Sequence, residues 1–312
     1  MAEIGGYFGL ENLIHSEYYP DYIALNTARN AVAYLIKIKG IKKIYIPKYL
    51  CDSIFKLCER EGCEYEFYEV DSNFQPIFDK MLNNNEWLYI VNYYGQVDNV
   101  IELKERYRRI IFDNVQAFFQ KQVEGVDTIY SCRKFFGVPD GAYLSSDIRQ
   151  DLEEDVSKDR MEHVLGRYEI TASEFYGKYV ENEESYYDLP VRAMSKLTRN
   201  ILGAVDYEFV KRRREENFSY LHERLSEKNG ISVNMVEGSF AYPFYVKGGM
   251  EIKKALAGKG IYVPSLWPSA MEFGGLAKDY SENILPLPCD QRYSVDEMKI
   301  IVDELEKNLC RG

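Results

Sequence analysis

The chain has 312 residues, of which 46% are hydrophobic and 29% are charged, and its formal net charge is −11. This composition is typical of a soluble globular protein, and the acidic balance argues against nucleic-acid binding, which normally uses a basic surface. No segment approaches the roughly 20 apolar residues of a membrane span, and the six cysteines and three histidines show no zinc-binding spacing, so neither a membrane anchor nor a metal site is expected.

From residue 22 onward, short apolar segments alternate with amphipathic ones. Strands are expected at 23–25, 43–47, 64–70, 87–92, 109–113, 127–131 and 141–146. Apolar residues from 28 to 36 recur at the spacing of one helix face, a second helix ends before Gly62, and a third covers 98–107. Such repetition predicts an α/β fold with a mostly parallel seven-stranded sheet sandwiched by helices. Ligands of such sheets bind beyond the carboxyl ends of the strands.

The pattern changes after residue 146. Residues 147–205 are helical and charged and are expected to form a connector. A strand within 240–248, a helix over 250–259, a strand at 260–264 and a final helix over 294–309 indicate a small α+β unit. We therefore expect a large domain over 1–205, which includes the connector, and a small C-terminal domain over 206–312.

Polar residues follow the first strand where the first helix begins, in the order Asn26, Thr27, Ala28 and Arg29. A helix N-terminus has unpaired N–H groups and a positive dipole, so it suits a phosphate, to which Thr27 adds a hydroxyl and Arg29 a charge. Asn and Thr are also ordinary helix caps, so the segment alone does not decide between the two roles.

Chemically active side chains also follow later strands. The strand over 109–113 ends in Asp113, a carboxylate that is costly to bury without a cation. The strand over 127–131 ends in Ser131, and Lys134 follows three residues later in the segment YSCRKFFGVPDGAYL. A lysine amine becomes nucleophilic when desolvation or a neighbouring cation lowers its pKa. Gly137 and Gly141 would let the backbone turn back into the sheet.

These residues together suit one cofactor, pyridoxal phosphate. It needs an amine for its Schiff base, a phosphate cradle and an acid that keeps its ring nitrogen protonated. Asn92 and the two tyrosines after it end another strand and could contact a planar ring or pack in the core. Tyr130 and Lys134 also match the YxxxK pair of short-chain dehydrogenases, but the glycine-rich turn that those enzymes need is missing.

Several segments together resemble the nucleotide-sugar aminotransferase family of the DegT/DnrJ type, which has the aspartate-aminotransferase fold. The resemblance covers nearly the whole chain and makes it a short, divergent member. The matching segments are IPKYLCDSIFKLCEREGCEYEFYEVD, VNYYGQVDNV, IIFDNVQAFF with its Asp-x-x-Gln signature, SCRKFFGVPDGAYL with its lysine loop, VRAMSKL and ILPLPCDQRYSVDEM.

The resemblance implies a role for each matching residue. Lys134 would be the Schiff-base lysine, Asp113 the partner of the pyridine nitrogen, and Gln116 a contact of the phenolic oxygen or the ring face. Cys51 stands where the family usually has an aromatic residue stacked on the ring. The phosphate would be held by Thr27, Ala28 and Ser131.

The sequence therefore predicts a pyridoxal-phosphate aminotransferase that moves an amino group from a glutamate-like donor to a keto-sugar nucleotide or a related ketone. Tyr94, Arg192 and Trp267 are candidate substrate contacts. Two alternatives stay open: another reaction of the same cofactor, such as a lyase or decarboxylase reaction, and a non-catalytic protein that retains the fold. The resemblance also implies a homodimer, and the unpaired cysteines and the N-terminus, which has no basic leader, favour a cytoplasmic location.

Overall fold

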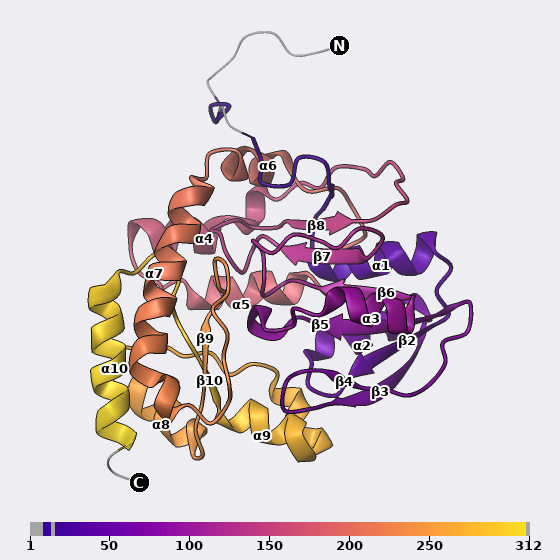
Figure 1. The fold of residues 1–312 in the computed structure, drawn as a ribbon. Coiled ribbons are helices and arrows are strands. Elements are labelled where there is room, and N and C mark those ends of the chain that lie inside the picture. Colours follow the sequence, from indigo (N-terminus) through magenta and orange to yellow (C-terminus); the bar gives the residue numbers. More distant parts are fainter. Residues whose placement is uncertain (1–8, 14–15, 310–312) are drawn as a thin grey trace.

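A computed structural model describes residues 9–13 and 16–309, so the expectations about the first eight residues, His15 and Cys310 lie outside the described residues. Within these ranges the main sheet has eight strands in the spatial order β1-β8-β7-β6-β5-β2-β3-β4 (Figure 1). The strands are β1 (Ile23–Leu25), β2 (Lys43–Pro47), β3 (Glu64–Val70), β4 (Pro76–Ile77), β5 (Glu86–Val91), β6 (Ile110–Asp113), β7 (Asp127–Ser131) and β8 (Ala142–Ser145).

The order of the strands defines where a ligand can bind. Strands β3, β2, β5, β6 and β7 are parallel, β8 is antiparallel to β7, and β1 is antiparallel to β8. From β2 the chain moves outward to β3, whereas from β5 it moves the other way to β6 and β7. The strand order therefore reverses between β2 and β5, and such a reversal opens a crevice at the carboxyl ends of the strands.

The expectation of seven strands was one too few. The additional strand, β4, has two residues and pairs antiparallel with the end of β3, with Val70 opposite Pro76. A turn at Asp71 joins the two strands, and its carboxylate Oδ1 accepts hydrogen bonds from the backbone N–H groups of Asn73 and Gln75. Two residues are too few to produce the alternating pattern by which a strand is recognised.

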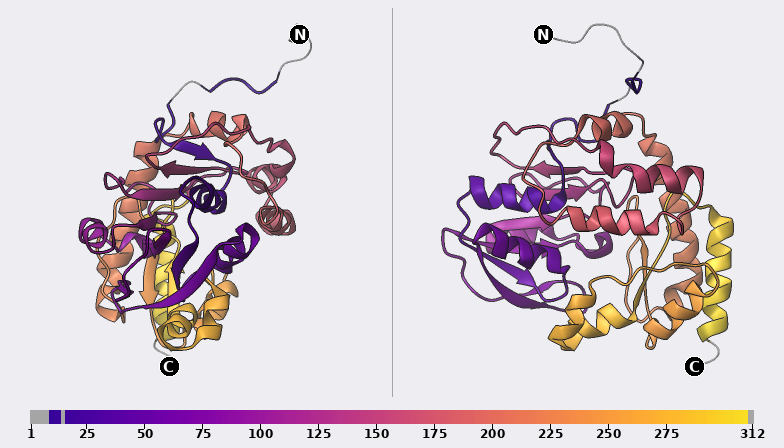
Figure 2. Two further views of the ribbon diagram at one scale, coloured as in Figure 1. Left: turned by 90° about the vertical axis from the view of Figure 1, so that its right-hand side faces the viewer. Right: turned by 180° about the vertical axis from the view of Figure 1, so that it is seen from behind.

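Helices cover both faces of the sheet. The first three are α1 (Ala28–Ile38), α2 (Asp52–Glu61) and α3 (Val100–Tyr107). Because β2-α2-β3 and β5-α3-β6 run in opposite directions across the sheet, right-handed crossovers place α2 and α3 on opposite faces. Helix α1 contacts α2 and so shares its face, an arrangement that the left view of Figure 2 shows.

The connector and the C-terminal part are mainly helical. Their helices are α4 (Glu162–Glu169), α5 (Tyr176–Ser185), α6 (Lys196–Leu202), α7 (Tyr207–Leu225), α8 (Gly249–Ala257), α9 (Gly275–Asn283) and α10 (Val295–Leu309), with short 3-10 turns at 93–95, 158–160, 226–228 and 268–273. Two strands, β9 (Tyr242–Tyr245) and β10 (Ile284–Leu287), form a separate antiparallel pair. Pro243 lies opposite Pro286 in this pair, which a two-stranded sheet tolerates because each strand has a free edge.

The expected strand at 260–264 is irregular backbone, and β10 takes its place as the partner of β9. The apolar side chains of Ile261 and Val263 pack partly buried on the hydrophobic core of the C-terminal part, so they show the pattern of a strand without pairing as one.

Two of the hydrophobic clusters correspond to the two parts of the chain. One lies around the parallel strands, and another lies among α7, α8, α10, β9 and β10. Trp267, Ala270, Ala277 and Tyr280 belong to the first cluster although they follow residue 206, so this segment packs back on the large sheet. In the described part of the chain, no helix combines the length and the apolarity that crossing a bilayer requires.

Candidate active site

Most of the predicted site residues gather at one edge of the sheet. Thr27 follows β1, Asp113 ends β6, Ser131 ends β7, and Cys51 is the residue before α2, at the end of the segment that follows β2. This edge contains the reversal between β2 and β5, where a crevice is expected.

Lys134 lies in a tight turn directly after β7. The N–H groups of Phe135 and Phe136 both donate to the carbonyl of Cys132, which coils the backbone around the lysine. The loop closes at Gly141, whose N–H donates to the carbonyl of Asn26 at 2.6 Å. Gly141 has φ +115°, a conformation that L side chains rarely adopt, and a Cβ there would lie 2.9 Å from Cγ2 of Thr198. Gly137 has no positive φ, so of the two expected glycine hinges only Gly141 needs its glycine.

Lys134 and Asp113 influence each other. Desolvation by the surrounding protein groups lowers the pKa of the Lys134 amine below that of a free lysine, while the negative charge of Asp113 opposes this shift. The Lys134 side chain is nevertheless exposed to solvent. A group that protein surrounds but water still reaches lies in a concave part of the surface, which is where a ligand could meet it. The Lys134 Nζ also lies 5.7 Å from the ring centroid of Phe240.

Asp113 is held in one orientation. It is 4% exposed, its Oδ2 accepts a hydrogen bond of 2.6 Å from the Tyr89 hydroxyl, and its Oδ1 accepts one of 2.8 Å from the Val115 N–H. Burial raises the pKa of Asp113, and the Tyr89 hydroxyl, Lys134 and the Val115 N–H each counteract part of this effect. A carboxylate fixed in this way is suited to a cationic partner.

Gln116 lies fully buried beside this carboxylate. Its Oε1 accepts a hydrogen bond of 2.8 Å from the Tyr94 N–H, and its Nε2 is buried without a partner. Tyr94 has φ +54°, a backbone conformation that L side chains rarely adopt, and its hydroxyl is buried near that of Tyr49. Strained backbone and unpaired buried donors are most often found at functional sites.

The start of α1 carries an unpaired cation. Thr27 caps the helix, with its Oγ1 accepting from the Asn30 N–H at 3.0 Å, while Ala28 and Arg29 form the first turn. Nε and Nη1 of Arg29 are buried without a hydrogen-bond partner, and the guanidinium lies 4.2 Å from the ring centroid of Tyr187. Burial lowers the pKa of Arg29. Unpaired guanidinium donors beside a helix N-terminus are what a phosphate would satisfy.

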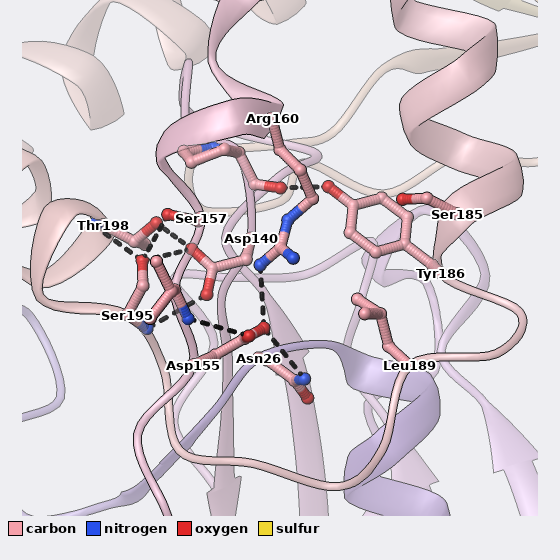
Figure 3. Close-up of polar contacts among 12 residues, drawn as sticks. Asn26, Asp140, Asp155, Ser157, Arg160, Ser185, Tyr186, Leu189, Ser195 and Thr198 are labelled. Carbon is pink, nitrogen blue, oxygen red and sulfur yellow. Dashed lines mark hydrogen bonds and ion pairs between the residues drawn. The ribbon is translucent and has the colours of Figure 1, made fainter.

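A buried polar network holds this helix start against the lysine loop (Figure 3). The Asp140 carboxylate, next to Gly141, accepts hydrogen bonds from the Ser195 N–H at 3.0 Å, from its hydroxyl at 2.8 Å, and from the Thr198 hydroxyl. Asp155 accepts from Asn26 at 3.1 Å and pairs with Arg160 at 2.7 Å. The connector therefore fixes both the end of β1 and the glycine turn.

Other predicted residues lie differently. Cys51 is half-buried and raises the pKa of both Lys134 and Arg29, so it lies near both. Asn92 is fully buried, and its amide is engaged by Asn114, Gln120 and the Val97 N–H, which leaves it a structural contact at the end of β5.

The three candidate substrate contacts differ in their surroundings. Tyr94 lies beside Gln116. Arg192 is half-buried, its Nη2 lies 3.9 Å from Oε2 of Glu153, and its carbonyl accepts from the Asn26 N–H. Trp267 is 7% exposed and packs edge-on against Tyr49, with 4.6 Å between the ring centroids. Their role in substrate binding stays a prediction.

Sequence reasoning missed Tyr89, Tyr187 and Phe240. Tyr89 could have been found from strand register, because Val91 pairs with Asp113 and Tyr89 lies two residues earlier on the same face. Tyr187 and Phe240 approach the site from the connector and the C-terminal part, and no local pattern indicates such contacts.

Comparisons with known proteins point to the same fold. No protein-family model and no curated protein matches the sequence. Among solved structures, a DegT DnrJ EryC1 StrS aminotransferase from Brucella abortus is 14% identical with a TM-score of 0.60, covering 91% of this chain and 85% of that one. Sugar aminotransferase CalS13 from Micromonospora echinospora is 13% identical with a TM-score of 0.61, covering 92% and 87%.

NtdA from Bacillus subtilis, solved with its cofactor PMP bound, is 12% identical with a TM-score of 0.66, and the match covers 91% of this chain and 72% of that one. Identities this low establish the fold alone. The chain thus has the fold of the DegT/DnrJ-type aminotransferases, as its motifs predicted.

Proposed function

We propose that the protein is a pyridoxal-phosphate-dependent aminotransferase. The observation that carries this proposal is the meeting of Lys134 and Asp113, each shifting the pKa of the other, at the carboxyl edge of a sheet whose fold is shared with aminotransferases. The unpaired donors of Arg29 and Gln116 support it, because they fit the phosphate and the ring of this cofactor.

Each residue has a distinct task in this proposal. Pyridoxal phosphate, when bound, supplies an electron sink for the substrate's reacting carbon. The lowered pKa of Lys134 favours the neutral amine, which can bind the cofactor and later accept and return a proton through Nζ. Asp113, oriented by Tyr89, would keep a proton on the ring nitrogen. Thr27, Ala28, Arg29 and Ser131 would hold the phosphate, with Cys51 and Gln116 next to the ring.

The substrates are proposed from the comparisons. The structural neighbours are described as sugar aminotransferases, which favours a keto-sugar acceptor and an amino-acid donor such as glutamate. Tyr94, Arg192 and Trp267 are the proposed substrate contacts. We further propose a homodimer in the cytoplasm, with a large domain over 1–205 and a small one over 206–312; the free thiols of the described cysteines support a reducing compartment.

A single-turnover experiment tests the reaction type. Protein loaded with pyridoxal phosphate is mixed with glutamate, and absorption spectra and released 2-oxoglutarate are recorded. Stoichiometric 2-oxoglutarate is expected, and Lys134→Ala should release none above the level without protein. Release of carbon dioxide instead would favour a decarboxylase, and a cofactor-loaded protein that converts none of the common amino donors would favour the non-catalytic alternative.

A further inference from the structure

Arg214 is a buried cation bonded to neutral partners. It lies on α7, in the C-terminal part of the chain, and is 1% exposed. Its Nε donates to Oε1 of Gln291 at 2.8 Å, and its Nη1 donates to the Ser239 carbonyl at 2.8 Å. Burial lowers the pKa of Arg214 to about 10. The nearby Asp290 carboxylate, which is paired with Arg292, partly opposes this shift, but the groups to which Arg214 itself donates are neutral, so its buried position requires an explanation.

The bonds of Arg214 reach the residue next to the candidate catalytic lysine. Its Nη2 lies 3.4 Å from the carbonyl oxygen of Phe135, and its guanidinium lies 4.5 Å from the centroid of the Phe135 ring. Gln291 completes the arrangement, because its Nε2 donates to the same Phe135 carbonyl at 2.7 Å. Two side chains from the C-terminal part thus bind the carbonyl of the Phe135–Phe136 peptide, one residue beyond Lys134.

Arg214 also reaches the other side of the lysine. Its Nη1 lies 3.5 Å from the Phe240 carbonyl, and the ring of Phe240 is the one that lies 5.7 Å from the Lys134 amine. The same guanidinium therefore contacts both the turn that contains Lys134 and the backbone of Phe240, whose ring lies near the Lys134 amine. Reactive groups must be held within about 0.5 Å of their working geometry, and a turn does not provide this without support.

We propose that Arg214, acting with Gln291, is a positioning residue for Lys134. It holds the carbonyl groups of Phe135 and Phe240 in place, so that the Lys134 amine stays desolvated by protein groups and near Asp113. The inference rests on the proposed function only in taking Lys134 as the reactive amine.

The decisive variant is Gln291→Met. Methionine is close to glutamine in length and is neutral, so the variant changes no charge near Lys134. It removes the donor to the Phe135 carbonyl, so the turn that contains Lys134 loses this contact. Arg214→Met removes the cation as well, and Arg214→Lys restores a charge without the planar set of donors. Arg212→Met, an exposed position on the same helix, is the matched control.

The readout is the reactivity of the Lys134 amine in the cofactor-free protein. Trace acetylation is measured against pH by mass spectrometry of the Lys134 peptide, with the exposed Lys196 as internal standard. We expect the pH midpoint of Lys134 acetylation to rise toward 10.5, the value of a free lysine, in Gln291→Met, and to rise partly in Arg214→Lys, which keeps the positive charge. Arg214→Met should raise the midpoint further, because it also removes a cation. Capture of pyridoxal phosphate should slow by about tenfold, as expected for a misplaced group. Arg212→Met should behave as wild type.

An unchanged pH midpoint of Lys134 acetylation in folded Gln291→Met would overturn the proposal, whatever the stability of the Arg214 variants. The acetylation profile does not depend on the cofactor. Failure of the wild type to capture pyridoxal phosphate would therefore contradict the proposed function alone, while the comparison of midpoints would still decide the role of Arg214.

Discussion

The buried Asp113 carboxyl group lowers the stability of the cofactor-free protein, although the same carboxylate is suited to bind a cationic group. Burial raises its pKa above the 3.8 of a free aspartate. Between 3.8 and that raised pKa the folded protein binds more protons at this group than the unfolded chain does, so its contribution to stability falls as the pH rises through this window. The carboxylate is therefore held at a cost to the cofactor-free protein, which a protonated ring nitrogen would offset.

Replacing Asp113 by asparagine tests this cost. Asparagine is neutral, its Oδ1 can accept from the Val115 N–H, and its Nδ2 can donate to the Tyr89 hydroxyl. Asp113→Asn should therefore be at least as stable as wild type at neutral pH and less dependent on pH above about 4. Transamination should fall by about 10²-fold, because the ring nitrogen loses its anionic partner. Denaturant unfolding of the cofactor-free proteins across this pH range provides the measurement. A clear loss of stability at neutral pH would show that the carboxylate is a structural requirement.

Local sequence identified the residues at strand ends but not their distant partners. Lys134 and Asp113 each end or follow an apolar run, so their placement could be predicted. Arg214 sits in a basic run that resembles a solvated helix face, yet it is buried, because its environment is set by residues that lie 25 to 79 positions away in the sequence. A pattern of neighbours along the chain carries no information about such contacts.

At the scale of elements, the turn at Gly141 joins the lysine loop to β8. A Cβ at this position would meet Cγ2 of Thr198 at 2.9 Å, and the positive φ adds strain of its own.

Gly141→Ala is expected to destabilise the protein by about 1–3 kcal/mol and to weaken cofactor capture. Combining it with Thr198→Ser removes the clashing methyl group but keeps the hydroxyl that donates to Asp140. If thermal unfolding shows that the double variant regains part of the lost stability, the regained part is due to the clash and the remainder to backbone strain. A single variant as stable as wild type would show that the loop accommodates a side chain.

An ion pair ties the end of α1 to the start of β7. Lys39 Nζ lies 2.8 Å from Asp127, which is 4% exposed, and 2.7 Å from Asp147. Lys39→Met leaves Asp127 buried and without its cation, so a loss of about 3–5 kcal/mol in the free energy of unfolding is expected. Lys43→Met, which removes the more exposed pair with Glu66, should cost under about 1 kcal/mol. Equal losses in denaturant unfolding would contradict this difference.

At the scale of the whole molecule, the alternation of strands and helices was enough to predict the fold class. Each of the seven expected strands is present. The parallel strands β2, β5, β6 and β7 contain short apolar runs that stand out in the sequence, and β3 alternates polar and apolar residues. The two-residue β4 and the irregular segment at 260–264 could not be predicted, since one is too short to form a pattern and the other has the pattern without the pairing.

The oligomeric state is a prediction at this scale. Apolar side chains are exposed along α4 and α5, including Leu165, Tyr168 and Tyr176, as expected of a surface that another subunit covers. Light scattering after size exclusion should give twice the 36.5 kDa of the chain. A monodisperse monomer that still binds pyridoxal phosphate would contradict the homodimer.

The most direct test of the account is the near-visible absorption of purified protein incubated with pyridoxal phosphate, comparing wild type with Lys134→Ala. The arrangement of Lys134 near Asp113 and the start of α1 predicts that wild type develops the band of a covalently held cofactor after free cofactor is removed, and that Lys134→Ala does not. An equal band in both proteins would place the reactive amine elsewhere, and the absence of a band in wild type would contradict cofactor binding itself.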